Sequence, residues 1–273
     1  MNLNLIQRIT ISIVTITYND LNGLKSTVSM IDKKITSLYL HTEHIIINGR
    51  PGDKTEEFIN SIIQNRFIKT ILISEADDGI YDAMNKGVEK STGDFVIFIN
   101  SGDLIVNNYD NSDIFELLRE ELNNNDSAGI AFSCNYNIFN NRIKITPRYI
   151  NKRLPKMPTL HQGILYKRSV LNKIKFSLKY KICGDFENFC AIFIKNNFTT
   201  YDFIISELMA GGVSTNKPLL LFSESRSIFK KYFIPNYLRI LVYDLRLMKS
   251  ILQFQFIYRT LSFLHLFQFK KII

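Results

Sequence analysis

Small polar side chains follow each of four apolar segments in the first part of the chain. In chain order they are Thr17, Tyr18, Asn19 and Asp20; then Asn48, Gly49, Gly52 and Asp53; then Glu75, Asp77 and Asp78; and finally Asn100, Ser101, Gly102 and Asp103. Any one group has a structural explanation, because Asn, Asp and Gly are common turn and helix-capping residues. Four groups placed alike after four strands would meet at one edge of a sheet, where open α/β sheets bind ligands. We therefore expect a ligand site at this edge.

The chemistry of that site is constrained by what the sequence lacks. Neither GxGxxG nor GxxxxGK[ST] occurs in the chain, which disfavours a dinucleotide oxidoreductase and a P-loop enzyme. Phosphate at this edge would need another partner. Carboxylates there favour a hard divalent cation, Mg²⁺ or Mn²⁺, that bridges diphosphate oxygens.

The segments around these residues alternate between strand and helix patterns. Nearly uninterrupted apolar and β-branched runs predict strands at 9–17, 43–47, 69–74 and 94–99. Helices are predicted after the first three strands, which is typical of βαβ units and a largely parallel sheet in an α/β fold. Further along, the patterns predict helices over 112–122 and 185–196 and strands over 128–134, 135–147 and 163–166.

Three segments carry a resemblance to a known family. They read ISIVTITYND at 11–20, SEADDGIYDAMNKG at 74–87 and TGDFVIFINSGD at 92–103. Together they resemble the family-2 glycosyltransferases of GT-A fold, in particular the bacterial branch that builds capsule, O-antigen and exopolysaccharide. The resemblance covers residues 9–215. It implies an inverting enzyme that moves a sugar from a nucleotide-diphospho-sugar to an acceptor.

The resemblance also implies a set of donor-binding residues. They are Thr17, Asn19, Asn48, Asp77, Asn85, Lys86, Asn100 and Ser101. Asn48 stands where the family has an Asp that faces the base, and its amide oxygen could still accept from a base N–H. Asp77 could contact the donor, cap the following helix, or do both. Lys86 could approach the diphosphate or simply pair with Asp82 four residues earlier.

The metal and the catalytic base are implied at two further places. Asn100–Asp103 takes the place of a DxD-like metal turn, and Asp103 is the carboxylate left to hold Mg²⁺ or Mn²⁺. Asp185 aligns with the base that deprotonates the acceptor hydroxyl, and Glu187 is the reserve candidate. A plain helix N-cap is the competing explanation for Asp185.

A His-Gln pair, His161 and Gln162, resembles a turn that precedes a short strand in the family. These two residues could touch the acceptor or the donor phosphate. A structural, hydrogen-bonding histidine is an equal alternative.

The basic charge of the chain is concentrated at its C-terminal end. The whole chain has a net charge of +9, and residues 219–273 alone carry nine Lys or Arg against two acids, with twelve of the thirty-four Phe and Tyr. We therefore divide the chain into a catalytic domain, 1–218, and a helical extension, 219–273. Basic and aromatic residues together favour an anionic membrane surface or a lipid-linked acceptor. Packing on the catalytic domain and self-association into a homo-oligomer are the alternatives, and no motif indicates nucleic acid.

These features combine into one functional hypothesis. We expect a hexosyl- or N-acetylhexosaminyl-transferase that uses a UDP- or dTDP-linked donor and a glycan or lipid-linked acceptor in bacterial surface polysaccharide synthesis. Three cysteines without metal-ligand spacing and no signal-peptide pattern favour a cytoplasmic protein, peripheral at the inner face of the membrane. A non-catalytic relative that binds nucleotide sugar or glycan is one alternative. A nucleotidyltransferase is another, although 17–22 offers no basic phosphate loop.

Overall fold

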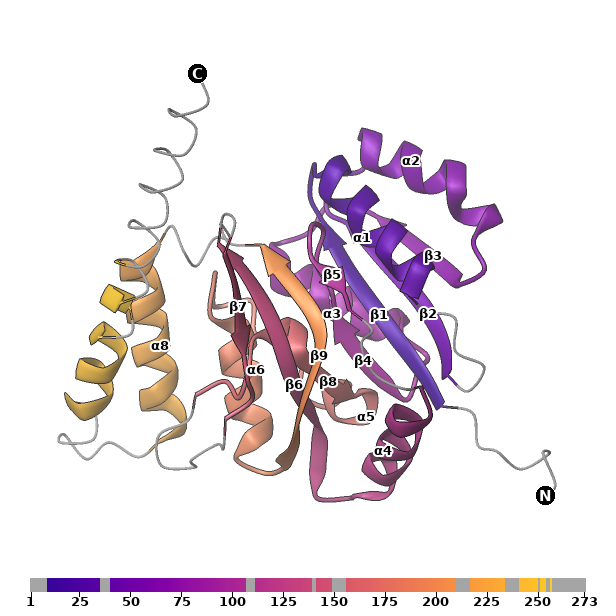
Figure 1. Ribbon diagram of the computed structural model, residues 1–273. Coiled ribbons are helices and arrows are strands. Elements are labelled where there is room, and N and C mark those ends of the chain that lie inside the picture. Colours follow the sequence, from indigo (N-terminus) through magenta and orange to yellow (C-terminus); the bar gives the residue numbers. More distant parts are fainter. Residues whose placement is uncertain are drawn as a thin grey trace.

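The four predicted N-terminal strands pair in parallel within a sheet that has nine strands among the described residues (Figure 1). The computed structural model describes residues 9–34, 40–106, 111–138, 141–148, 156–209, 217–233, 241–249, 251–253 and 256. The strands are β1 (Ile9–Thr17), β2 (Leu40–Asn48), β3 (Lys69–Ser74) and β4 (Phe95–Phe98), in the spatial order β3-β2-β1-β4. The helices between them are α1 (Leu21–Lys34), α2 (Lys54–Ile62, continued by the short 3-10 turn Ile63–Asn65) and α3 (Ile80–Lys90).

The second half of the chain extends this sheet with mixed strand directions. The order continues β8-β6-β9-β5, and β7 pairs with β6. The bounds are β5 (Leu104–Ile105), β6 (Ser127–Ile138), β7 (Asn141–Ile145), β8 (Ile164–Lys167) and β9 (Asn197–Met209). β8 joins β4 antiparallel, β7 pairs antiparallel with β6, and β9 is parallel to β6. The α/β fold is therefore as expected, with a sheet that is mixed overall.

One long strand, β9, was not among the predicted elements. Its sequence, NFTTYDFIISELM, mixes polar and apolar residues without a clear period of two. The pairing of β9 with β6 explains the irregular pattern. This pairing contains register shifts, and at each shift the side chains no longer alternate between the two faces of the sheet. Buried and exposed positions therefore do not follow the pattern of a regular strand.

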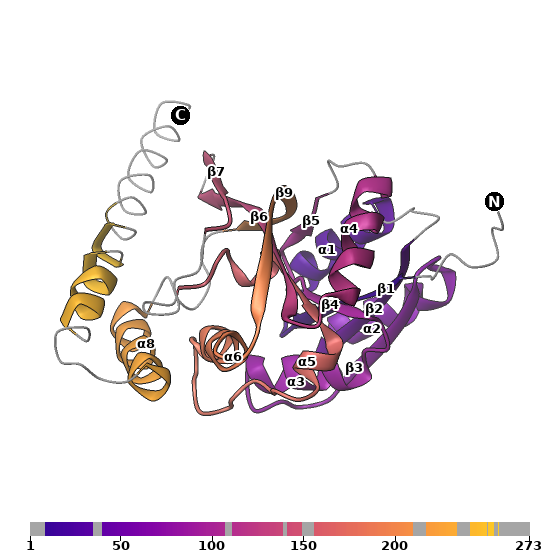
Figure 2. The same cartoon turned by 90° about the horizontal axis from the view of Figure 1, so that it is seen from below.

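The core lies on both faces of the sheet. Val14, Ile45 and Phe98 face α3 and α6 (Gly184–Phe193), while Ile13 and Phe95 face the side of α4 (Asn111–Asn123). The alternation of buried residues within one strand follows from the pleat, since neighbouring side chains point to opposite faces. Figure 2 shows α3 and α6 together on one side of the sheet.

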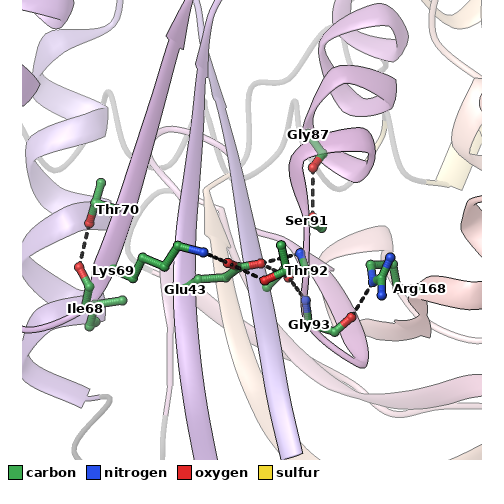
Figure 3. Close-up of polar contacts among 10 residues, drawn as sticks. Glu43, Ile68, Lys69, Thr70, Gly87, Ser91, Thr92, Gly93 and Arg168 are labelled. Atoms are coloured by element: carbon green, nitrogen blue, oxygen red, sulfur yellow. Dashed lines mark hydrogen bonds and ion pairs between the residues drawn. The ribbon is translucent and has the colours of Figure 1, made fainter.

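A buried carboxylate joins the elements at the edge of the sheet opposite the polar turns (Figure 3). Glu43 of β2 accepts hydrogen bonds from the Ser12 hydroxyl at 2.7 Å and from the Thr92 N–H at 2.6 Å, and it pairs with Lys69 at 3.1 Å. Burial raises the pKa of Glu43, but these hydrogen bonds outweigh it and lower the pKa to about 2. The charged carboxylate thus ties β1, β3 and the turn before β4 to β2.

The first helix of the basic extension packs on the catalytic fold. α8 (Pro218–Tyr232) lies beside α6 in both views (Figures 1 and 2), and its Ile228 belongs to the same hydrophobic cluster as Cys183 and Phe189. The predicted boundary at 218 thus falls at the start of a helix that shares the core. A further helical segment covers 241–249, where Tyr243 stacks on Phe229 at a ring distance of 4.2 Å.

Apart from 233, 251–253 and 256, the rest of the predicted extension lies outside the described residues, as does the greater part of the segment after β9. Within the described part of the chain, no helix combines the length and the apolarity that crossing a bilayer requires.

Candidate active site

The ends of three parallel strands bring the polar turns together. Thr17, Asn48 and Ser74 are Cα partners in adjacent strands, so the turns that follow β1, β2 and β3 begin at the same level of the sheet. Asn19 adopts the left-handed conformation, with φ of 51°, which Asn tolerates better than most residues. The Thr17 hydroxyl is buried without a partner among the described residues. The polar turns therefore meet at one edge of the sheet, as predicted, and the ligand site there stays a prediction.

A cleft of about 710 Å³ opens beside the first two turns. Asn19, Arg50, Asp53 and Lys54 are among the residues that line it. Asp53 is also the N-cap of α2, where Oδ1 accepts the N–H groups of Thr55 and Glu56. Its Oδ2 is buried without a partner in the described part of the chain. The cleft thus combines two cationic side chains, Arg50 and Lys54, with the carboxylate of Asp53.

Asn48 shapes the second turn. The side chain is fully buried, and its amide nitrogen donates to the Arg50 carbonyl at 2.9 Å and to Asp53 Oδ1 at 3.0 Å. Its Oδ1 accepts the Arg50 N–H at 3.2 Å. The expected direct contact between Asn48 and a base does not fit this arrangement, because both ends of the amide are already used inside the protein. Asn48 instead holds the turn that lines the cleft.

Asp77 connects the third turn to the second. Its carboxylate lies over Gly49 so closely that a Cβ at that position would overlap it. Its Oδ1 accepts the Gly79 N–H at 2.9 Å, just before α3. The N-cap of α3 is Gly79, and no side chain caps the helix, so Asp77 closes the turn before α3 and does not cap it. A contact between Asp77 and the donor stays a prediction.

Asn85 and Lys86 serve the structure of α3. Asn85 pairs with the backbone of Phe176 in both directions, at 2.9 Å each. Lys86 donates to the Ala76 carbonyl at 2.8 Å and pairs with Glu75 and Asp82 at 3.0 Å. Lys86 thus closes the third turn onto α3, and the expected i,i+4 pair with Asp82 is present. Asn85 faces the segment before α6, so we no longer expect it at the diphosphate.

The fourth turn is anchored to the first and to the His-Gln turn. The Ser101 hydroxyl donates to Asp20 Oδ2 at 2.8 Å, which joins the turns after β4 and β1. Asp103 is 8% exposed, and its Oδ2 accepts a hydrogen bond from the Gln162 amide at 2.8 Å. Burial raises the pKa of Asp103 to about 6, although hydrogen bonds from Gln162 and from backbone N–H groups lower it.

The fit of this turn to a divalent cation can be judged from its donors. The amide oxygen of Asn100 is buried without a partner among the described residues, and Asp103 supplies a carboxylate in the same turn. Two oxygen donors beside a diphosphate suit a hard cation, which completes its shell with phosphate oxygens and water. No group of three or more His, Cys, Asp or Glu that could hold a metal occurs within the described ranges. The residues present therefore fit a cation held jointly with its ligand.

His161 lies in an aromatic pocket behind that turn. The ring is 6% exposed and stacks on Phe98 at a centroid distance of 4.9 Å. Its Nδ1 lies 3.5 Å from the Tyr166 hydroxyl, whereas Nε2 has no partner among the described residues. Burial lowers the pKa of His161, so the ring is neutral at physiological pH. The unsatisfied nitrogen distinguishes this histidine from a fully hydrogen-bonded structural one.

Asp185 lies in the first turn of α6, and a tyrosine from α3 holds it. Asp185 Oδ1 accepts the Phe186 N–H at 2.8 Å and the Tyr81 hydroxyl at 3.3 Å. Its Oδ2 receives no hydrogen bond from the described part of the protein. Gly184 lets the Tyr81 ring approach, because a Cβ there would overlap the ring. Burial raises the pKa of Tyr81, so its hydroxyl stays a donor.

Tyr81 was not singled out from the sequence, although it lies within the SEADDGIYDAMNKG segment. Helical spacing places it beside apolar residues, and it is indeed 6% exposed. The signal that could have identified it is the hydroxyl, since a buried tyrosine usually finds a partner.

Glu187 does not face the polar edge. It is 3% exposed, and its Oε1 pairs with Lys231 at 2.6 Å and accepts the Tyr232 hydroxyl. Both partners come from α8. Glu187 thus joins α6 to α8, and we no longer keep it as a candidate for the base or for acceptor contact.

The mixed α/β sheet with polar turns along one edge is an arrangement that comparisons with known proteins identify. The glycosyl transferase family 2 pattern matches residues 12–196. The chain therefore belongs to glycosyl transferase family 2.

Relatives and solved structures extend this result. An uncharacterised glycosyltransferase of Mycobacterium tuberculosis is 36% identical over 94 residues, 34% of each chain. A PGL/p-HBAD biosynthesis glycosyltransferase of Mycobacterium bovis is 23% identical over 146 residues, 53% of this chain and 56% of the relative. The matched region thus spans about a third to a half of these relatives.

Among solved structures, S. aureus TarS is similar, with a TM-score of 0.63 and 16% identity over 86% of this chain and 43% of TarS. Its 1–349 fragment in complex with UDP-GlcNAc also gives a TM-score of 0.63, at 14% identity over 88% of this chain and 73% of the fragment. The mannosyltransferase PcManGT of Pyrobaculum calidifontis, in complex with GDP-Man and Mn²⁺, gives 0.59 at 13% identity over 82% and 64%. These similarities establish the GT-A fold.

Proposed function

We propose that this glycosyltransferase moves a sugar from a nucleotide-diphospho-sugar to an acceptor hydroxyl with inversion, and that Asp185 is the general base. The observation that carries the proposal is the restrained carboxylate at the start of α6, with Oδ1 bonded to Tyr81 and Oδ2 open. Asp185 takes the acceptor proton as the hydroxyl oxygen bonds to the anomeric carbon. The bond from that carbon to the diphosphate breaks, and the nucleoside diphosphate departs.

The donor in this proposal occupies the edge formed by the four polar turns. Thr17, Asn19 and Asp77 contact the nucleoside, and Asn100 and Ser101 lie at the diphosphate. The Arg50 and Lys54 cations beside the cleft attract the negative charge of the donor. UDP-GlcNAc in one similar structure and GDP-Man in another support a nucleotide-sugar donor. We favour a UDP- or dTDP-linked hexose or N-acetylhexosamine.

A divalent cation, Mg²⁺ or Mn²⁺, belongs to the same proposal. Asp103 and the Asn100 amide oxygen would hold it. When bound, it would neutralise charge that develops on the departing diphosphate. Gln162 orients the Asp103 carboxylate. In this proposal His161, whose buried Nε2 has no partner among the described residues, stays the candidate for contact with the acceptor or the donor phosphate.

The acceptor that we propose is a glycan or lipid-linked molecule in bacterial surface polysaccharide synthesis, at the inner face of the cytoplasmic membrane. The exposed side chains Leu241, Leu245, Met248, Leu252 and Phe256 recur at intervals of three or four residues. Such spacing puts them on one helical face. Together with the net charge of +7 over 219–273, this apolar face suits contact with an anionic lipid surface.

Nucleoside diphosphate release from a panel of UDP-, dTDP- and GDP-sugars tests the enzymatic proposal, with water as the acceptor. Thermal-shift measurements with the same panel report binding separately. We expect Asp185→Asn to abolish release and to keep the donor-induced shift. A Glu116→Gln variant is the control for loss of a carboxylate, since Glu116 is exposed on α4, where it pairs with Arg119. Binding without release by the wild-type protein would favour the non-catalytic alternative, which the single carboxylate of the fourth turn keeps open.

A further inference from the structure

A carboxylate from α8 binds the backbone directly before the proposed catalytic base. Glu224 Oε1 accepts the Lys181 N–H at 2.8 Å, and Oε2 accepts the N–H groups of Ile182 and Cys183 at 3.1 and 3.0 Å. Three consecutive N–H groups converge on one side chain. Glu224 lies outside the residues 12–196 that match the family.

The three N–H groups lie directly before the first residue of a helix. Backbone donors at this end have no carbonyl partner within the helix itself. α6 begins at Gly184, and its first backbone bond runs from the Glu187 N–H to the Cys183 carbonyl at 2.9 Å. A negative charge is favourable at this end of a helix because of the helix dipole. Glu224 thus supplies, from another element, the acceptor that the local sequence lacks.

The same two helices are joined a second time in the opposite direction. Glu187 of α6 binds Lys231 and Tyr232 of α8, while Glu224 of α8 binds the segment before α6. The Cys183 thiol adds a contact to the Ser225 hydroxyl at 3.4 Å. One carboxylate from each helix therefore binds the other helix or the residues before it, and together they fix the position of α6 relative to α8.

We propose that Glu224 is a positioning residue for Asp185, so that the first helix of the C-terminal extension is part of the catalytic unit. This inference rests on the proposed function, because it needs Asp185 to be the base. Asp185 follows Cys183 by two residues, so the backbone that Glu224 holds determines where the carboxylate lies. Tyr81 holds the Asp185 side chain from α3, and Glu224 holds its backbone from α8. A displacement of about 1 Å at such a group can reduce turnover by roughly 100-fold.

Glu224→Gln tests the inference with little change in shape. A glutamine has one acceptor oxygen, and its amide nitrogen would face a backbone N–H. We expect amide hydrogen exchange of 181–183 to accelerate at least about 10-fold, because a backbone donor without an acceptor exchanges after smaller openings. We expect kcat for nucleoside diphosphate release to fall by about 10- to 100-fold with little change in the donor KM.

Phe229→Leu is the matched control for weaker packing of α8. Phe229 is 1% exposed, packs on Tyr243 and contacts none of 181–183 through a hydrogen bond. The variant should lower the unfolding temperature while kcat and the exchange of 181–183 stay near the wild-type values. Activities are compared at a temperature well below unfolding for each variant.

The outcomes separate the inference from the function on which it depends. No release from any donor by the wild-type protein would overturn the proposed function and this inference with it. An active wild type together with unchanged kcat in Glu224→Gln would overturn the inference alone. An equal fall of kcat in Phe229→Leu would also overturn it, since stability of α8 would then explain the effect. Should Glu224→Gln fail to fold, Glu224→Asp, which keeps the charge but shortens the reach, decides by the same measurements.

Discussion

The side-chain amide of Gln162 donates a hydrogen bond to Oδ2 of Asp103 at 2.8 Å, across 59 positions of the sequence. The bond joins the turn after β4 to the turn before β8. It orients a buried carboxylate and favours its charged form, which burial disfavours. Burial therefore raises the pKa of Asp103, and the hydrogen bond from the Gln162 amide lowers it.

Asp103→Asn should change how stability depends on pH. The pKa of Asp103 is about 6 in the folded protein, above its ordinary value, so the folded state holds the proton more tightly than the unfolded state. The stabilisation that this tighter proton binding gives the folded state is complete below about pH 4 and is lost as the pH rises through 6. The stability of Asp103→Asn relative to the wild type should therefore rise by about 2.5 kcal/mol between pH 4 and pH 7.5. Urea unfolding at both pH values measures this, and a constant difference would contradict it.

A divalent cation should act through the same residue. Mn²⁺ with UDP should raise the unfolding temperature of the wild type by mass action and should not raise that of Asp103→Asn. Chelation should suppress nucleoside diphosphate release and added Mn²⁺ should restore it. Full turnover in a chelator would reject the metal role of Asp103. Gln162→Ala should weaken the response to Mn²⁺ without removing it, because the ligand remains while its orientation is lost.

Tyr81→Phe should impair turnover more than stability. The variant removes the hydroxyl that bonds Asp185 at 3.3 Å and keeps the ring that packs on Gly184. The free energy of unfolding should fall by about 1 kcal/mol, while kcat should fall by about 10-fold. Tyr243→Phe is the matched control, since its buried hydroxyl bonds the Ser225 carbonyl in α8. Equal kcat in Tyr81→Phe and the wild type would mean that this bond does not serve the base.

Glu43→Gln should destabilise the fold at neutral pH. The pKa of Glu43 is lowered to about 2, so its contribution is present above pH 4.5 and is lost as the pH falls through 2. The free energy of unfolding of the variant should be about 3 kcal/mol lower than that of the wild type at pH 7, and this difference should shrink as the pH falls. Lys69→Met should cost less than about 1 kcal/mol, because its side chain is 61% exposed. Chemical unfolding of both variants and the wild type at pH 7 and pH 3 measures these differences. If the loss of stability in Glu43→Gln did not shrink at pH 3, the assigned pKa would be wrong.

The apolar face of the C-terminal extension should bind anionic lipid. Leu245→Glu combined with Leu252→Glu should abolish co-sedimentation with phosphatidylglycerol vesicles, since both side chains are exposed and a carboxylate opposes anionic headgroups. Ser223→Glu, with its hydroxyl exposed on α8, controls for the added charge. Unchanged vesicle binding would reject this surface. A change of molecular mass in light scattering instead would identify self-association.

Local patterns in the sequence were enough to predict much of the fold and part of the site. The predicted strand at 69–74 coincides with β3, and the start of β1 and its last residue are also as expected. Those strands are buried apolar runs ended by turn residues, so their pattern depends on few distant contacts. The placement of polar residues after parallel strands followed from the same alternation, because such strands end at one edge.

The tertiary structure decided which of those polar residues are available to a ligand. Asn48 and Asn85 have the same side-chain chemistry as Asn100, yet both are engaged by hydrogen bonds inside the protein. Of these three, Asn100 alone has a buried oxygen without a partner among the described residues. Asp185 meets Tyr81 across 104 positions, and Glu224 reaches back from α8 to the residues before it. Hydrogen bonds between residues so far apart leave no periodic trace in the sequence. They depend on how helices pack on the sheet, and that packing determines which carboxylates are free for chemistry.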